Sequence, residues 1–383
     1  MTALRTVARA VGALLLVPVA VVAWEYAWTP VYHFPPPRPF AGARWYNPYE
    51  APLGAMWRAA NFHAHSAAWG SLTNGHQSAA EVRAAYRRLG ADVAQLSNYH
   101  LIDSTGADST FIPTYEYGYS ITKTHRLALG ARGVNWLDFP LGQSRDEMQL
   151  ILDRLRATAA LTVINHPVMR HGHTATDLAA LGNYDLIEAV SSYGDSPAEW
   201  DAALSSGHAV WALGSDDNHD VRRADLLGRC WTMVLTTSTR ADAVLQALKA
   251  GRQVAVRGAA LTSDNGIRGV AMLGDTLTVT LERVARHIRF IGDGGRELAE
   301  VRDAATARHV AGRGDSYVRI VIENAATTIW TNPVVRWDGV ALPDPRPTLD
   351  VAATWALRLG IIVLYGVVVI LARTLLSSRR HPS

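Results

Sequence analysis

Asn61-Phe62-His63-Ala64-His65-Ser66 is the first segment of the chain with the chemistry of a binding site. A mostly apolar run, residues 55–60, precedes it. On an extended backbone, side chains at i and i+2 point to the same side, so both imidazoles can reach one metal ion. A single His-x-His pair often occurs by accident. The pair therefore predicts a metal site only if other ligand-type residues gather near it.

Other ligand-type residues follow short apolar runs further along the chain. They are Glu116, His125, His166, Asp217 and His219, with Glu188 as an additional carboxylate. We predict that each lies at the C-terminal end of a strand, the edge where α/β barrels and parallel sheets carry their sites. A mixed set of imidazoles and carboxylates suits zinc, manganese or iron, and its size suits more than one ion. Glu188 is either a neighbour of the ligands or an ordinary strand-end carboxylate.

Helix and strand signals alternate between residues 58 and 258. Ser78-Ala-Ala-Glu81 and Ser144-Arg-Asp-Glu147 have the spacing of capping boxes, and Ser196-Pro197 places a proline at the start of a third helix. Strands are predicted at residues 92–96, 161–164 and 209–213, and a further helix at 176–181. This alternation predicts an α/β domain with a parallel sheet, either open or closed into a barrel.

The pattern changes after Gly258. Residues 276–281, 287–291 and 317–323 alternate apolar and polar side chains, and glycine-rich turns separate them. They predict a small antiparallel β domain over residues 259–345. Because His287 and His309 are not grouped with other ligand types, we expect this domain to shape access without binding metal.

Both ends of the chain are apolar. Residues 1–29 are predicted to be a membrane anchor, with a cleaved signal peptide as the alternative. Residues 30–57 are predicted to be a semi-rigid spacer, because they include Phe34-Pro-Pro-Pro-Arg-Pro39. Residues 352–377 are predicted to be a second transmembrane helix, and the alternative is a buried core helix.

Basic residues flank the two predicted spans on the same side. They are Arg5, Arg9, Arg373, Arg379 and Arg380. By the positive-inside rule both termini are cytoplasmic. The chain is therefore expected in the cell (inner or plasma) membrane, held in the lipid bilayer by two helices, with residues 30–350 on the extracytoplasmic side.

Composition excludes several classes of protein. Hydrophobic residues make up 49% of the 383, which excludes a largely disordered chain. The net charge is only +3 and the arginines are scattered, so we expect no nucleic-acid partner. Cys230 is the only cysteine, which excludes an internal disulfide and a cysteine-rich metal site. No feature of the sequence indicates a protein partner.

In their order along the chain, these motifs resemble the PHP (polymerase and histidinol phosphatase) superfamily of metal-dependent phosphoesterases. The matching elements are His63-x-His65, Glu116, His125, Asn165-His166-Pro167 and Asp217-x-His219, over about residues 58–258. Asp315-Ser-Tyr-Val-Arg-Ile-Val and Trp330-Thr-Asn-Pro-Val look like the appended β domain of CehA/McbA-type metallohydrolases. The resemblance implies a distorted (β/α)7 barrel with a small C-terminal antiparallel β domain, here flanked by two transmembrane helices.

The resemblance also implies a set of ligands. His63, His65 and Asp217 would bind one metal, His125 and His166 a second, and Glu116 would bridge the two. The chain departs from the family at Ser97-Asn98-Tyr99, where Thr-Asp-His is usual, and at Asn74, where an aspartate is usual. We therefore expect two divalent ions and no third, unless His100 is shifted into place, and we expect His219 to ligate weakly or to act from behind the ligands.

Two divalent ions close together lower the pKa of a water and supply hydroxide near neutral pH. Asp217 or His219 is the candidate catalytic residue that takes or delivers the proton. Arg170, His171 and His173 are candidates for holding an anionic small-molecule substrate, although a solvated loop explains them equally well. Arg222 and Arg223 are weaker candidates.

The sequence thus favours a membrane-tethered, extracytoplasmic, metal-dependent hydrolase, with a phosphoesterase as the first hypothesis. The alternatives are hydrolysis of a carboxylic ester, amide or carbamate at the same centre, and a catalytically degenerate module that binds a metal or ligand.

Overall fold

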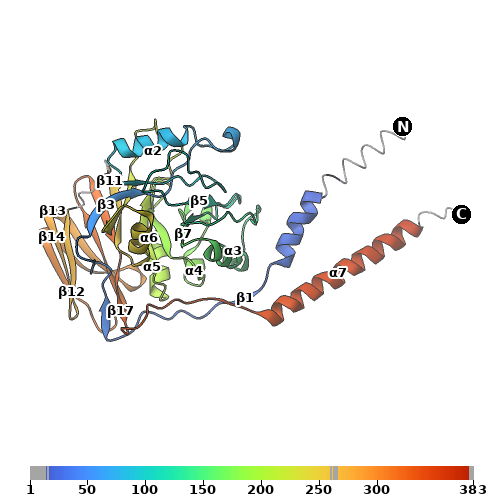
Figure 1. Cartoon of the computed structure of the whole chain (residues 1–383). Helices are drawn as coiled ribbons and strands as arrows, with labels where there is room; N and C mark the ends of the chain where they lie inside the picture. The colour runs from blue at the N-terminus through green and yellow to red at the C-terminus, as the bar shows by residue number, and fades with distance from the viewer. Residues whose placement is uncertain (1–13, 15–16, 259–260, 262–265, 379–383) are drawn as a thin grey trace.

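The computed structural model describes residues 14, 17–258, 261 and 266–378. They form a body of β-sheets and helices, from which two helices extend to the same side (Figure 1). Most of the predicted N-terminal anchor, residues 1–13 and 15–16, lies outside the described residues. Within the body, four clusters of buried apolar side chains make the core.

Five strands form one sheet in the order β5-β6-β7-β8-β9. They are β5 Thr114–Tyr117, β6 Arg126–Leu129, β7 Leu161–Ile164, β8 Leu186–Ser191 and β9 Trp211–Ser215. β7, β8 and β9 are parallel, whereas β6 is antiparallel to both of its neighbours. The prediction of a parallel sheet is therefore wrong for β6. Residues 118–125, between β5 and β6, are too few for the crossover that parallel neighbours require.

A larger sheet runs β12-β13-β15-β16-β11-β10-β3-β4. The strands from the first part of the chain are β3 Met56–Asn61, β4 Val93–Ala94, β10 Cys230–Thr236 and β11 Gln253–Gly258. Two single bridges link this sheet to the five-stranded one: Tyr99 pairs with Glu116, and Ala64 pairs with Asn218. Strand pairings and these bridges therefore connect β3 to β4, the residues after β4 to the five-stranded sheet, and the residues after β9 back to the residues after β3. Closure into a (β/α)7 barrel stays a prediction.

The C-terminal part of the larger sheet is antiparallel. Its strands are β12 Ile267–Leu273, β13 Thr276–Gly292, β14 Arg296–Val310, β15 Tyr317–Glu323, β16 Thr327–Thr331 and β17 Val334–Trp337. The two strands predicted at residues 276–281 and 287–291 are one strand, β13. Its pairing with β14 shifts register between Thr280 and Ala285, which accommodates the polar residues between the two predicted strands. β16 pairs with β11, so the sheet continues from this region into the rest of the body.

Local signals position the helices. They are α2 Ala79–Arg88, α3 Arg145–Thr158, α4 Ala175–Leu178, α5 Pro197–Ser205 and α6 Ala241–Lys249, and three 3-10 turns are η1 Trp69–Ser71, η2 Met169–His171 and η3 Asp293–Gly295. Both predicted capping boxes form at α2 and α3. α5 begins at its proline, although Ser196 makes no side-chain cap. α4 starts one residue earlier than predicted, behind a third capping box of Thr174 and Asp177.

A buried ion pair fastens the antiparallel strands to the α/β part. Arg319 on β15 donates two hydrogen bonds to the carboxylate of Asp201 on α5, at 2.8 and 2.6 Å, and Tyr317 donates a third at 2.8 Å. Losing one partner of such a pair leaves an uncompensated buried charge, at a cost of about 3–5 kcal/mol. The two parts are therefore held in one arrangement by polar contacts as well as by the shared sheet.

The predicted spacer is partly folded onto the body. It contributes β1 Tyr32–His33, which pairs with β18 Thr348–Leu349, and β2 Arg44–Tyr46, which pairs with β17. The first of these pairings brings the two ends of the chain together. Immediately beyond it, the N-terminal helix (residues 17–28) and α7 Val351–Ser378 leave the body.

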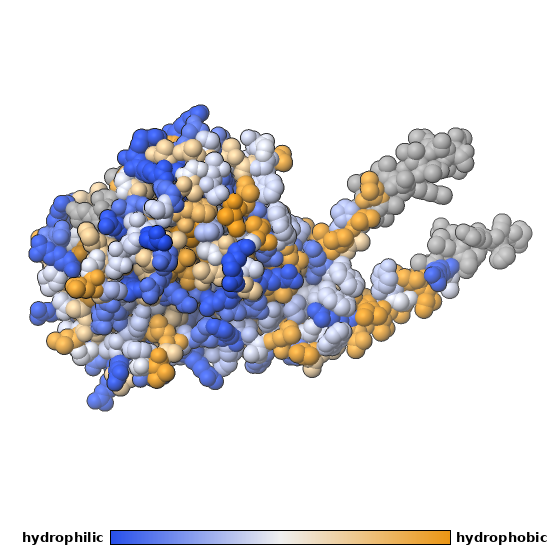
Figure 2. Space-filling model, viewed as in Figure 1, coloured by the Kyte–Doolittle hydropathy of each residue, from blue (hydrophilic) through white to orange (hydrophobic). Residues whose placement is uncertain are grey.

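Hydrophobic side chains gather along both of these helices (Figure 2). Among the described residues, one helix is long and apolar enough to cross a membrane, over Val351–Leu371 of α7, with a mean hydropathy of 2.2. Its first turns contact the N-terminal helix: the Arg358 guanidinium donates to the carbonyl of Trp28 at 3.0 Å and lies over the Trp28 and Trp355 rings.

Candidate metal centre

Six of the predicted ligands converge at one edge of the strands. His63 and His65 follow β3, Glu116 lies within β5, His125 immediately precedes β6, and His166 and Asp217 follow β7 and β9. The prediction that every ligand ends a strand is wrong for two of them. His125 reaches this edge because β6 is antiparallel to β5 and β7, so that the start of β6 lies beside the ends of those two strands.

Glu116 stands at the middle of the cluster and is completely buried. Its Oε1 lies 3.3 Å from His63 Nε2, 2.9 Å from His125 Nδ1 and 3.4 Å from His166 Nε2. Its Oε2 lies 3.2 Å from His65 Nε2. One carboxylate thus faces four imidazoles through its two oxygens.

Asp217 closes the opposite side of the cluster. Its Oδ1 lies 3.0 Å from the Nε2 atoms of both His63 and His65, and its Oδ2 lies 3.8 Å from His166 Nε2. Asp217 and His166 both have left-handed backbones, with φ of 46° and 25°. Such strain at non-glycine residues persists where the surrounding structure holds it, and it gathers at functional sites.

Two groups of side chains could each hold a metal ion. They are His63, His65, Glu116 and Asp217, and Glu116, His125 and His166. In each group, one potential ligand atom per residue lies within 4.8 Å of the others. Glu116 belongs to both groups, the place that a bridging carboxylate occupies.

A further layer of polar contacts orients these ligands. The Glu188 carboxylate lies 2.7 Å from His63 Nδ1, and it accepts hydrogen bonds from the Ser215 hydroxyl at 2.7 Å and from the backbone N–H of His166 at 2.9 Å. The Asn165 amide donates to Glu116 Oε1 at 2.9 Å. A carboxylate behind a ligating imidazole is the usual partner in metal sites, because it fixes the tautomer and the ring orientation. Of the two interpretations of Glu188, the contacts favour the neighbour of the ligands.

The electrostatics of the cluster suit a cation. Burial alone would raise the pKa of Glu116, but the adjacent His125 and His63 outweigh burial and hold that pKa well below its usual value. In the same way, burial opposes ionisation of Asp217, while His63 and His65 keep its pKa well below the usual range. Both carboxylates are therefore held as anions deep inside the protein. Buried anions require compensating positive charge.

The buried imidazole nitrogens of the cluster indicate whether a metal ion fits there. Within the described part of the chain, several buried imidazole nitrogens of the cluster make no hydrogen bond of acceptable geometry. They are His63 Nε2 and His65 Nε2, which lie 3.0 Å from Asp217 Oδ1, and His65 Nδ1, His125 Nε2 and His166 Nδ1. Buried polar atoms are otherwise nearly always satisfied. Imidazole nitrogens and carboxylate oxygens are also the ligand types that zinc and similar ions take. The residues present thus fit divalent metal ions.

His219 lies beside the cluster. Its ring stacks on that of His65, with centroids 4.3 Å apart, and its Nδ1 lies 2.9 Å from the backbone carbonyl of Asp217. Burial, with His65 next to it, lowers the pKa of His219 to about 4. The ring is therefore neutral near pH 7, with a buried Nε2 that has no hydrogen-bond partner among the described residues.

Asn98 and His100 make hydrogen bonds within the protein. Asn98 accepts from the backbone N–H of Ser66 and donates to its hydroxyl, both at 2.8 Å. His100 Nε2 accepts from the N–H of Gly118 at 3.1 Å, and His100 Nδ1 donates to the carbonyl of Asn135 at 3.0 Å. Both nitrogens of His100 are thus used, and in this arrangement neither can ligate a metal.

The residues predicted to hold substrate are spread out. Arg170 is exposed and donates to the carbonyl of Ile121 at 3.3 Å, and His171 is also exposed. His173 is buried, and its two ring nitrogens have no hydrogen-bond partner among the described residues. Burial, followed by the nearby Arg126, lowers the pKa of His173 well below its usual value. None of the three lines the cavity at the metal cluster described next.

A cavity of about 280 Å³ opens directly onto Asp217 and His219. Its other walls include Tyr193, His76 and Arg223, of which only Arg223 was named from the sequence, as a weaker candidate. Tyr193 packs edge-on against His166, with ring centroids 6.0 Å apart. On the other side Tyr99 stacks on His65, with centroids 4.7 Å apart. In the sequence, Tyr99 stands out only within Ser97-Asn98-Tyr99, and no signal marks Tyr193.

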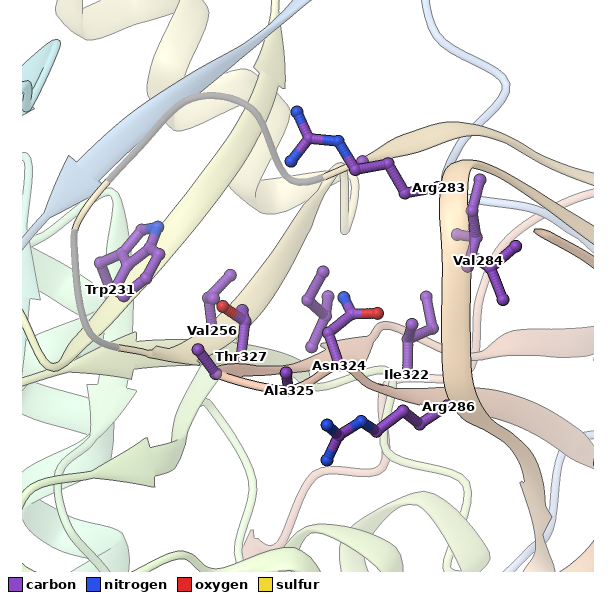
Figure 3. Close-up of a pocket in the computed structure, with 13 residues that line it drawn as sticks. Trp231, Val256, Arg283, Val284, Arg286, Ile322, Asn324, Ala325 and Thr327 are labelled. Atoms are coloured by element: carbon purple, nitrogen blue, oxygen red, sulfur yellow. The ribbon is translucent and has the colours of Figure 1, made fainter. Parts of the chain in front are cut away.

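A second cavity, of about 390 Å³, lies between β10, β11, β13, β15 and β16 (Figure 3). Its lining includes Trp231, Asn324 and Thr327, with Arg283 and Arg286 on β13. None of the described residues that line it is a histidine, cysteine, aspartate or glutamate. The chemistry of the cluster therefore belongs to the first cavity.

No protein-family model matches the chain, and no curated protein matches its sequence. Among solved structures, the chain is similar to a two-domain protein from Bacteroides vulgatus ATCC 8482 described as containing a predicted PHP-like metal-dependent phosphoesterase. The two chains are 15% identical, the match covers 80% of this chain and 99% of the other, and the TM-score is 0.42. At this level of similarity, function must be argued from the residues of the site itself.

Proposed function

We propose that the protein is a metal-dependent hydrolase of the PHP type, tethered to the membrane with its site on the extracytoplasmic side, and that it acts as a phosphoesterase. The observation that carries this proposal is the buried cluster of two carboxylates and four imidazoles, with Glu116 common to both groups of ligands. We also propose that β3 to β9 form the distorted barrel of that family and that the antiparallel strands form its CehA/McbA-like β domain.

In this proposal His63, His65 and Asp217 would hold one divalent ion, His125 and His166 would hold a second, and Glu116 would be shared between them. When bound, two such ions would lower the pKa of a water near neutral pH and would offset the negative charge that develops on the reacting group. Glu188 and Asn165 keep His63 and Glu116 in position. Asp217 remains ionised, since its pKa is depressed, and it lines the cavity, where it can orient a water by accepting a hydrogen bond. His219 is neutral and can pass a proton through Nε2.

Hydrolysis of a carboxylic ester, amide or carbamate is the second candidate, because the same centre can stabilise a tetrahedral oxyanion. The neutral phenol groups of Tyr99 and Tyr193 beside the cluster favour this possibility, since a phenol can donate a hydrogen bond to an oxyanion. Burial raises the pKa of Tyr193 to about 12, so its hydroxyl keeps its proton near pH 7.

The test compares four soluble substrates on the metal-loaded full-length protein in detergent. They are a phosphomonoester, a phosphodiester, a carboxylic ester and a carbamate with the same nitrophenol leaving group. We expect cleavage of one or both phosphate esters, abolished in His63→Ala and in Asp217→Asn. Cleavage of only the carboxylic ester or the carbamate would select the second candidate. A protein that binds metal but cleaves none of the four would instead indicate a binding module.

A further inference from the structure

Exposed apolar side chains lie on the loop that ends at His125 and on a second loop that is hydrogen-bonded to it. The connection between β5 and β6, residues 118–125, ends at His125 and carries Ile121, which is 60% exposed. The connection between β6 and α3 carries Trp136 and Leu141, which are 60% and 70% exposed. The backbone N–H of Ile121 donates to the carbonyl of Pro140 at 2.9 Å, so the two loops form one surface. Large exposed apolar patches mark interaction sites.

Ring contacts connect this surface to the ligands. Trp136 lies edge-on to Trp69, with ring centroids 5.9 Å apart. The Trp69 indole donates to the carbonyl of Tyr99 at 2.8 Å, and the Tyr99 ring stacks on His65. The apolar surface thus begins within two side chains of a candidate metal ligand. We call Trp69, Ile121, Trp136 and Leu141 the apolar rim.

The rim is also joined to the N-terminal helix. The Tyr26 hydroxyl donates to the carbonyl of Gly142 at 2.9 Å and accepts from the N–H of Leu141 at 2.8 Å, and the Tyr26 ring packs edge-on against Phe139. An apolar groove of about 780 Å³ separates the helix from the loop. Its walls include Val19, Val22, Ala23 and Ala27 of the helix, and Pro140 and Leu141 of the loop.

The apolar part of α7 indicates where the surface of a bilayer would lie relative to the body. The apolar window Val351–Leu371 has 21 residues and spans roughly 31 Å as a helix, close to the ~30 Å hydrocarbon core. Arg358 lies about 10 Å inside the start of this window. Its guanidinium sits between Trp355 and Trp28 and can reach toward the headgroups, and tryptophan is a residue type that prefers the membrane interface. The Arg358–Trp28 hydrogen bond places Trp28 at the same level. Tyr26 lies further along the N-terminal helix, so Leu141, bonded to it, lies at the interface as well.

We propose that the apolar rim docks into the surface of the bilayer and that the substrate is a membrane lipid with a phosphate ester headgroup. This inference rests on the proposed function, both for the hydrolytic centre and for the membrane tether. The rim and the groove receive the apolar end of the lipid, and the metal cluster receives its anionic phosphate. In the reaction a water oxygen bonds to phosphorus, one P–O ester bond breaks, and the departing alkoxide takes the proton that the water releases.

The first experiment replaces Leu141 with Asp and measures two activities of the full-length protein. One substrate is an anionic phospholipid in vesicles, and the other is soluble nitrophenyl phosphate. A charge at the interface weakens docking, so we expect Leu141→Asp to lower lipid hydrolysis by about tenfold or more and to leave cleavage of the soluble ester within about twofold. The matched control is Leu273→Asp on β12, where the side chain is 85% exposed, and it should change neither rate.

The second experiment does not depend on activity. The native Cys230 is buried, so a thiol-reactive fluorophore should label a new cysteine at position 141 selectively. A quencher carried on the lipid should quench Leu141→Cys and spare Leu273→Cys. Equal quenching at the two positions, or equal lipid hydrolysis by Leu141→Asp and the wild type, would overturn the inference. A wild type that cleaves the soluble ester but no lipid overturns the inference alone, whereas a protein without metal or any esterase activity overturns the proposed function.

Discussion

Glu116→Gln probes the centre of the cluster, because this substitution keeps the size of the side chain and removes its charge. The two oxygens of Glu116 lie within 3.4 Å of imidazole nitrogens from both groups of ligands. At an effective dielectric of about 20, two unit charges 4 Å apart interact by about 4 kcal/mol, and a divalent ion doubles that value. The amide oxygen of glutamine recovers part of the loss. We therefore expect a net loss of about 3 kcal/mol at each group, which is about 10²-fold in metal affinity.

Metal content and turnover test this expectation together. We expect Glu116→Gln to lower bound metal at both sites and to reduce turnover by more than about 10²-fold. His125→Ala should lower mainly the second site, since His125 belongs to only one group. Glu300→Gln, the same chemical change at a surface ion pair on β14, is the matched control and should behave like the wild type. A Glu116→Gln protein with two bound metals and near-normal turnover would refute the bridging role.

Three further predictions address the surroundings of the cluster. Glu188→Gln should lower metal affinity by about 10–100-fold in a competition titration, because the carboxylate behind a ligating imidazole is lost; unchanged affinity would make Glu188 a structural carboxylate. Gly118→Ala should deplete the second site in elemental analysis, because the added Cβ would meet His125 Cδ2 at 2.7 Å on a backbone with φ of 125°, and full occupancy would contradict the close contact. His287→Ala with His309→Ala should leave the metal stoichiometry unchanged, whereas loss of one equivalent would place a ligand in the antiparallel strands.

Local signals in the sequence were sufficient for several features of the fold. Both predicted capping boxes form, since a serine and a glutamate three residues later satisfy each other without help from the rest of the chain. β7 was predicted with its observed bounds because it is a short apolar run between a helix and Asn165-His166-Pro167. The grouping of ligand types after apolar runs also pointed to the residues that the structure brings together around Glu116.

Contacts between distant segments were beyond the reach of such signals. The role of Glu188 depends on β8 lying beside β9, so that Ser215 and His63 meet its carboxylate. The sequence also does not determine which way a loop side chain points. His173 is buried away from the cavity, whereas Tyr193 lines it. β13 continues through the polar residues that seemed to end it, because pairing with β14 and β15 outweighs the local pattern.

Elemental analysis of the purified full-length protein, before and after chelation, bears most closely on the proposal of a metal-dependent hydrolase. We predict two equivalents of divalent metal per chain, loss of esterase activity when they are removed, and recovery when zinc, manganese or iron is returned. We also predict that chelation lowers the melting temperature, because the buried Glu116 and Asp217 would then lack their compensating cations. Negligible bound metal, with activity and melting temperature unaffected by the chelator, would contradict the proposal.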